Sequence, residues 1–355
     1  MSVRASKISK TPALACRILV LLVAFGGCDD FGSGRTAPGR CAVVLVGTRS
    51  DDPVWQAVRA GAARFSREAR NLRLEEVLPS TSTPIAQKTA LERIETPSVP
   101  TVACVLAIDA RLLVQPIRRF MARGTQVVLI GDDAPQTRRR VFVGADEQAV
   151  GEAIGETLAS LCKTRRTVMV VHDDRGSERS VLRHEGFQRA RLMHPDLRVL
   201  REFDCLGDRG KALKLLYETS ERFPDLGGWA LLDDWLRDGV PADRRLLHGA
   251  ARIVSYGTVP GNLRLLEDGR VHALVGVDWE ALGYRAVQLA YQLLSLSVLP
   301  VRDYKAPPVV VTKENLAEYR TRWQGIISRP ASQPGAHSGG RPTGTPRTDR
   351  SRQTP

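Results

Sequence analysis

The chain has 355 residues, 43% of them hydrophobic, and carries a formal net charge of +13 at pH 7. This length exceeds the usual size of a single core, so we expect two lobes or domains with a real hydrophobic interior. Residues 1–27 and 329–355 each contribute +4, which leaves +5 for the body of the chain. Nucleic-acid binding needs a clustered basic face, so this modest excess argues against it.

The first 28 residues have the pattern of an export signal. A basic stretch precedes an uncharged run, residues 18–27, which is far shorter than the ~20 apolar residues of a spanning helix. The run ends in FGGC, and these small residues before Cys28 resemble a bacterial lipoprotein cleavage and lipidation box. We therefore expect a lipoprotein signal peptide over 1–28, a lipid anchor on Cys28 and a linker over 29–40. An ordinary signal peptide with an incidental cysteine is the alternative.

Short apolar runs then alternate with longer amphipathic stretches. In the first half, strands are predicted over residues 41–47, 72–79, 101–109 and 125–131. Helices are predicted between them, the first opening at Pro53. In the second half, strands are predicted over residues 167–173, 197–203, 228–234 and 251–257. Such alternation indicates parallel sheets covered on both faces, and two runs of four strands indicate two similar lobes.

The residues that follow these strands are rich in aspartate and aromatic side chains. In open parallel sheets, ligands bind beyond the carboxyl ends of the strands. Carboxylates accept hydroxyl hydrogens and flat aromatic faces pack on sugar rings, so this edge has the chemistry of a polyol or sugar site. The candidate ligand-binding residues are Asp52, Trp55, Asp132, Asp133, Asp233, Asp234, Trp235 and Tyr256. Helix capping is an open alternative for Asp133, and packing between lobes is one for Trp235.

Catalytic and metal motifs are missing from the sequence. GxSxG, the P-loop pattern and a GxGxxG after the first strand do not occur, and no nucleophile or metal set stands out. Cys41, Cys104, Cys162 and Cys205 are widely spaced with no CxxC pair. Cys41, Cys104 and Cys205 lie in or beside apolar runs, which predicts buried thiols and leaves a disulfide open. We expect no enzyme activity, no catalytic residue, no cofactor and no metal.

Several segments occur in an order typical of one family. They are DPVWQAVRAGA, VFVGADEQAVGE, RHEGFQRA and VVVTKENL, within about residues 41–323. This order resembles the ribose-type solute-binding proteins of bacterial ABC sugar transporters, which have the type 1 periplasmic binding fold. The resemblance implies an α/β protein with two Rossmann-like lobes, parallel sheets and three crossovers near Val143, Gly276 and Tyr304. A ligand in the cleft and closure by hinge motion are implied with it.

The same resemblance divides the chain into parts. The N-terminal lobe is expected over 41–143 plus 276–303 and the C-terminal lobe over 144–275 plus 304–328. The rest, 329–355, is expected to be a disordered basic tail, because its Pro, Gly, Ser, Thr and Arg include almost no apolar residue.

At several positions where the resemblance implies a ligand contact, this chain has a different residue. Asp52, Val54 and Trp55 stand in the loop after the first strand, and Asp233 stands where the family has an Asn. A ligand-binding Arg falls on Val181, with Arg183 matching its neighbour. Three further polar anchors fall on glycines, which are Gly131, Gly257 and Gly276. Each lost charged hydrogen bond removes ~1.5–3 kcal/mol, so binding would depend on nearby acids such as Asp132.

The sequence therefore predicts a solute-binding lipoprotein of the periplasm or cell envelope. It would capture a small polar ligand, such as a sugar, and pass it to an ABC permease in the membrane. The alternative is a sensor or envelope scaffold whose cleft is degenerate and no longer binds a sugar. A transcription regulator with the same core would need a helix-turn-helix ahead of Cys41, where the sequence has a hydrophobic signal and a linker.

Overall fold

The computed structural model describes residues 41–69, 71–95, 99–173, 177–237, 240–241, 246–295 and 302–329. All of these residues fall in one compact unit. The expected signal peptide, the lipidation site at Cys28, the linker and the basic tail after residue 329 lie outside them. Within the described ranges, no helix combines the length and apolar character needed to cross a bilayer.

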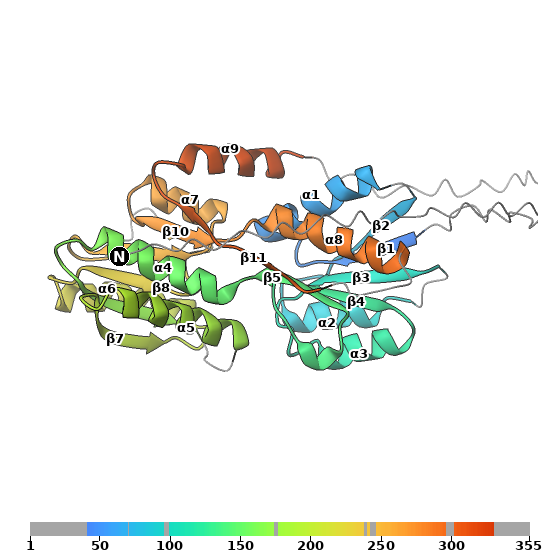
Figure 1. Ribbon diagram of the computed structural model, residues 1–355, viewed down its shortest axis with the longest axis horizontal. Helices are drawn as coiled ribbons and strands as arrows, with labels where there is room; N and C mark the ends of the chain where they lie inside the picture. Colours follow the sequence, from blue (N-terminus) through green and yellow to red (C-terminus); the bar gives the residue numbers. More distant parts are fainter. Residues whose placement is uncertain are drawn as a thin grey trace, which may run out of the picture. The chain divides into compact units, whose positions relative to one another are not determined.

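The N-terminal lobe is a six-stranded sheet of order β11-β5-β4-β3-β1-β2, in which all neighbours pair in parallel (Figure 1). Its elements are β1 (Cys41–Val46), α1 (Pro53–Glu68), β2 (Leu72–Val77), α2 (Pro84–Glu92), β3 (Thr101–Leu106), α3 (Val114–Ala122), β4 (Gln126–Ile130), the 3-10 helix η1 (Pro135–Thr137), β5 (Val141–Ala145), α8 (Trp279–Ser295) and β11 (Tyr304–Ala306). Every residue of β3 is buried, as expected for a strand covered on both faces.

The C-terminal lobe repeats this arrangement with the order β12-β10-β9-β8-β6-β7, and only β12 runs antiparallel to its neighbour. Its elements are α4 (Glu147–Leu161), β6 (Thr167–His172), α5 (Glu178–Met193), β7 (Arg198–Asp204), α6 (Arg209–Arg222), β8 (Gly228–Leu231), β9 (Arg252–Tyr256), α7 (Pro260–Glu267), β10 (Ala273–Gly276) and β12 (Val309–Val311). The α/β fold with two lobes is thus confirmed.

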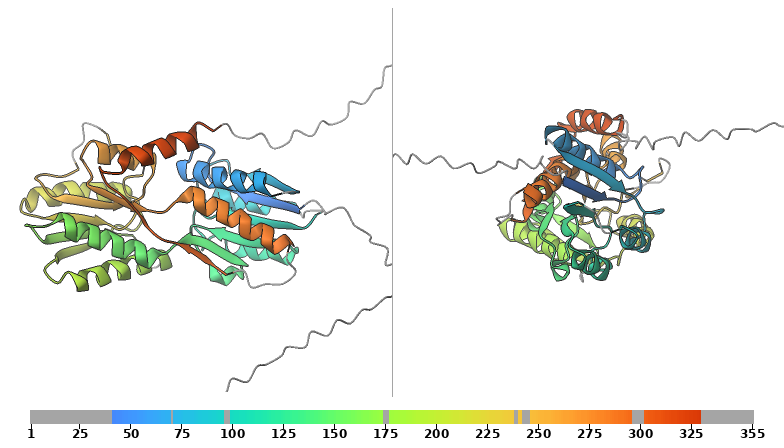
Figure 2. Two further views of the ribbon diagram at one scale, coloured as in Figure 1. Left: turned by 45° about the horizontal axis from the view of Figure 1, so that its top comes forward. Right: turned by 90° about the vertical axis from the view of Figure 1, so that its right-hand side faces the viewer.

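The chain passes between the two sheets three times. It leaves the first sheet after Ala145, returns after Gly276, and leaves again between Ala306 and Val309. The third passage lies later than the expected position near Tyr304, because β11 still pairs with β5 in the first sheet. A last helix, α9 (Leu316–Ile327), then packs on α1 of one lobe and α7 of the other (Figures 1 and 2).

Helices α4 and α5 pack so closely that their backbones touch. A Cβ built on Gly151 of α4 would lie 1.9 Å from the Arg183 carbonyl oxygen, and one on Gly186 of α5 would lie 1.9 Å from that of Gln148. Any side chain at either glycine would force the helices apart. This contact fixes Arg183 of α5 beside the start of α4, where Glu147 lies.

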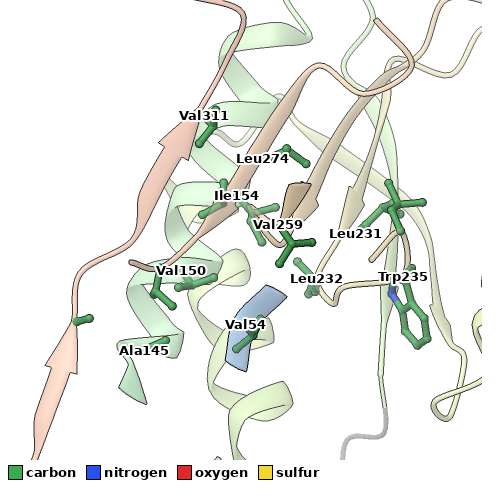
Figure 3. Close-up of a cluster of buried hydrophobic side chains, with 14 of the residues drawn as sticks. Val54, Ala145, Val150, Ile154, Leu231, Leu232, Trp235, Val259, Leu274 and Val311 are labelled. Atoms are coloured by element: carbon green, nitrogen blue, oxygen red, sulfur yellow. The ribbon is translucent and has the colours of Figure 1, made fainter. Parts of the chain in front are cut away.

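A continuous cluster of buried hydrophobic side chains links the two lobes. It includes Val54 from the first turn of α1 together with Leu232, Trp235 and Val259 of the C-terminal lobe, part of which Figure 3 draws. No disulfide joins the four cysteines of the described part, and Cys104, Cys162 and Cys205 are buried thiols.

Candidate functional site

A cavity of about 550 Å³ lies where the carboxyl ends of the two sheets face each other. Its lining residues follow β1, β3 and β4 of the first sheet and β6, β8 and β9 of the second. This size is within the usual range for a small-molecule site. Six of the eight predicted ligand-binding residues line it: Asp52, Asp132, Asp233, Asp234, Trp235 and Tyr256.

Asp52 has three roles at the start of α1. Its carboxylate accepts the Val54 backbone N–H at 2.9 Å, which caps the helix, and the Thr48 hydroxyl at 3.0 Å. It also forms an ion pair of 2.5 Å with Arg237, which comes from the other lobe. The cleft is therefore bridged at this point by a carboxylate and a guanidinium.

Trp55 and Asp133 are the two candidates that the structure places away from this cavity. Trp55 is fully buried in the core. Gly47 leaves room for its indole, since a Cβ on Gly47 would fall 2.3 Å from the ring. The ring lies under β1, and Val54 lines the cavity in its place. Asp133 pairs with Arg139 at 2.5 Å and lines an adjacent cavity of about 930 Å³.

A buried ion triad forms the base of the site. The Arg183 guanidinium donates to Glu147 Oε2 at 2.5 and 2.8 Å and to Asp233 Oδ1 at 2.8 Å. Its central carbon lies over the Tyr256 ring, 3.9 Å from the ring centre, and so makes a cation–π contact with a residue of the cavity wall. Burial lowers the pKa of Arg183, and the two carboxylates more than offset this, so the pKa is raised and the group stays charged.

Asp234 occupies the space beside Gly257. Its Oδ1 accepts a hydrogen bond of 2.7 Å from the Asn262 amide, which also donates to the Gly257 carbonyl at 3.0 Å. Gly257 has φ +99°, and a Cβ there would lie 2.4 Å from Asp234 Oδ1. The space that the glycine leaves at position 257 is thus filled by a carboxylate that follows β8.

The other two substituted glycines are also covered by neighbouring side chains. A Cβ on Gly131, where φ is +82°, would lie 3.4 Å from the Trp279 ring and from Leu106. A Cβ on Gly276 would lie 2.9 Å from the Thr258 hydroxyl. Neighbouring side chains therefore occupy the space that a side chain at Gly131 or Gly276 would fill.

Arg179 is a cleft residue that sequence reasoning missed. It lines the cavity from the first turn of α5, two positions before Val181, and makes no hydrogen bond or ion pair with the described residues. Burial lowers its pKa, but the charges of Asp233 and Asp132 raise it more, so the guanidinium stays protonated. The resemblance placed a ligand-binding arginine at Val181, and Arg179 is an arginine only two positions away. This proximity is the signal in the sequence that could have identified it.

We expect the stability of the protein to depend on pH through Asp234. Burial raises the pKa of its carboxyl to about 6, against the opposing effect of the Asn262 hydrogen bond. The folded state then holds a proton that the unfolded state has lost, so the free energy of unfolding falls as pH rises from about 4 to about 6.

Urea unfolding of the wild type and of Asp234→Asn across this range measures the effect. The free energies of unfolding of the two proteins should differ least below pH 4, and above pH 6 the difference should be larger by about 3 kcal/mol. Parallel profiles would mean that Asp234 does not titrate in this window.

No group of three or more His, Cys, Asp or Glu side chains in the described ranges is arranged to hold a metal ion. The cleft instead combines carboxylates, guanidinium groups, two indoles and a phenol. These groups bind hydroxyl and other polar groups of a solute by hydrogen bonds.

Two α/β lobes with a polar cleft between their strand ends define a protein of the type 1 periplasmic binding fold. A comparison with family models matches residues 43–296 to the periplasmic binding protein domain. The chain belongs to this family. It is a family of binding proteins and not of enzymes, and it implies a location outside the cytoplasm.

Solved structures share the fold at low sequence identity. An ABC transporter solute-binding protein from Burkholderia graminis, in complex with D-arabinose, has a TM-score of 0.65 at 18% identity, over 78% of this chain and 97% of its own. A glucose-galactose binding protein from Geobacillus stearothermophilus has a TM-score of 0.63 at 23% identity, over 78% and 98%. A periplasmic ribose ABC transporter protein from Conexibacter woesei has 0.67 at 18%, over 81% and 98%. No curated protein sequence matches the chain.

Proposed function

We propose that the protein captures a small polar solute, such as a sugar, in the cleft and delivers it to an ABC permease. The observation that carries this proposal is the Arg179 guanidinium, which lines the cavity and makes no hydrogen bond or ion pair with the described residues. The charges of Asp233 and Asp132 keep it protonated. A charged donor without a bonded partner in a cavity favours a ligand whose hydroxyl or other acceptor groups pair with it.

The export route is part of the same proposal. Lipidation of Cys28 would tether the protein to the membrane, next to the permease that takes up the solute. The family's location outside the cytoplasm and the FGGC segment after an uncharged run support this. A second candidate function is contact with another protein through a cleft that binds no sugar. The Arg237 ion pair on Asp52 favours it, because this carboxylate already has a partner within the protein.

A ligand screen tests the proposal. The purified protein is heated with sugars, polyols, amino sugars and amino acids, and each hit is measured by calorimetry. A ligand at one hundred times its dissociation constant should add about 2.7 kcal/mol to the free energy of unfolding. Arg179→Met should weaken binding at least about tenfold, because it removes a charged donor from the cavity.

Arg189→Met is the matched control. Arg189 lies on the same helix, but its side chain is 60% exposed and does not line the cavity. Its substitution should leave affinity unchanged. A protein that unfolds cooperatively and responds to no solute in the panel would support the second candidate instead.

A further inference from the structure

The two walls of the cavity differ in chemistry. On the side of the N-terminal lobe, the lining includes six apolar side chains, which are Val54, Leu106, Ala107, Ile108, Ala145 and Trp279. On the side of the C-terminal lobe, most lining residues are charged, and Arg179 lies there. A solute in this cavity therefore meets an apolar surface on one side and a polar one on the other.

Polar groups of the N-terminal wall are largely engaged within the protein. Asp52 is bonded to Thr48 and Arg237, and Asp51 pairs with Arg49. Asp132 accepts the Ala110 backbone N–H at 3.0 Å. On the opposite wall, by contrast, the Arg179 guanidinium makes no hydrogen bond or ion pair with the described residues and can donate to a ligand.

Trp279 is the largest apolar side chain that lines the cavity from the N-terminal lobe. It is the first residue of α8 and is half-buried, with its ring edge facing the position of Gly131. A methyl group at Gly131 would already be in van der Waals contact with Trp279 Cζ3 and Leu106 Cδ1, both at 3.4 Å. A longer side chain there, such as the family's acid, would compete with the indole for this space.

We propose that Trp279, seated over Gly131, is the specificity-determining side chain of the cleft and selects a polyhydroxylated solute with one apolar face, of the chemical class of deoxy sugars. This inference rests on the proposed capture of a small polar solute. A hydroxyl turned toward this wall would lose its bonds to water without replacement, whereas a methyl group there gains contact with the indole. The hydroxyls of the opposite face would pair with Arg179 on the charged wall.

Calorimetry with matched sugars tests the inference. A set of D- and L-hexoses is compared with the 6-deoxy form of each, which replaces one hydroxymethyl group by a methyl group. For the stereoisomer that binds, the 6-deoxy form should bind at least about tenfold more tightly than its parent. Trp279→Ala should reduce this preference to about threefold or less, and Trp279→Phe, which keeps an aromatic face, should retain most of it.

The outcomes separate the two proposals. If a parent hexose binds as tightly as its 6-deoxy form, or if Trp279→Ala keeps the preference while its thermal unfolding stays cooperative, this inference is overturned and solute capture stands. If no sugar of the set binds, the inference is overturned. If the wider solute panel is silent as well, solute capture is overturned with it.

Discussion

Arg183→Met should destabilise the protein by about 3–5 kcal/mol, the usual cost of removing one partner from a buried ion pair. Arg183 is 1% exposed and serves both Glu147 and Asp233, and it donates to the Leu232 carbonyl as well. Methionine keeps much of the apolar volume but leaves two buried carboxylates without their cation. The free energy of unfolding in urea measures the loss.

Arg179→Met provides the matched comparison for stability. It makes the same substitution four residues earlier on α5, at a half-buried arginine with no direct bond to the described residues. We expect its free energy of unfolding to change by no more than about 1 kcal/mol. Equal losses in the two variants would show that the triad is not what holds α4, α5 and β8 together at the cleft.

Long apolar runs made most of the fold predictable. The strands β1, β3, β4 and β6 are rich in β-branched residues and alternate with helices. The bounds predicted for each lie within a few residues of those observed. By contrast β10, β11 and β12 have only three or four residues each. Such short strands carry no periodic signal, and they exist because the chain passes from one sheet to the other there.

The candidate site was predictable where it depends on strand ends. Asp132 and Asp233 line the cavity because they follow β4 and β8, and the parallel sheets bring these ends to one edge. Trp55 was assigned to the cleft wrongly. Successive side chains of a helix point about 100° apart, so Val54 faces the cavity and Trp55, the next residue, faces the core. Arg179 was missed because it reaches the cavity from the first turn of a helix, two positions before Val181.

Gly257→Ala should lower the free energy of unfolding by about 2 kcal/mol more than Gly124→Ala does. Both glycines have positive φ, +99° and +91°, so an alanine at either one incurs a similar backbone cost of about 1–2 kcal/mol. Nothing lies within 4 Å of a Cβ on Gly124, whereas one on Gly257 would fall 2.4 Å from Asp234 Oδ1 and 2.8 Å from Asn262 Nδ2. The difference between the two variants therefore measures the displacement of Asp234 from the cleft.

A double substitution decides whether that displacement is the cause. Asp234→Ala removes the carboxylate that the new Cβ would meet, so Gly257→Ala should cost no more than Gly124→Ala in the Asp234→Ala background. If Gly257→Ala remains costlier there, the strain lies in the backbone or at Asn262 and not at Asp234. If the extra cost disappears in the Asp234→Ala background, Gly257 and Asp234 are energetically coupled. Asp234 can then reach the cavity only because residue 257 has no side chain.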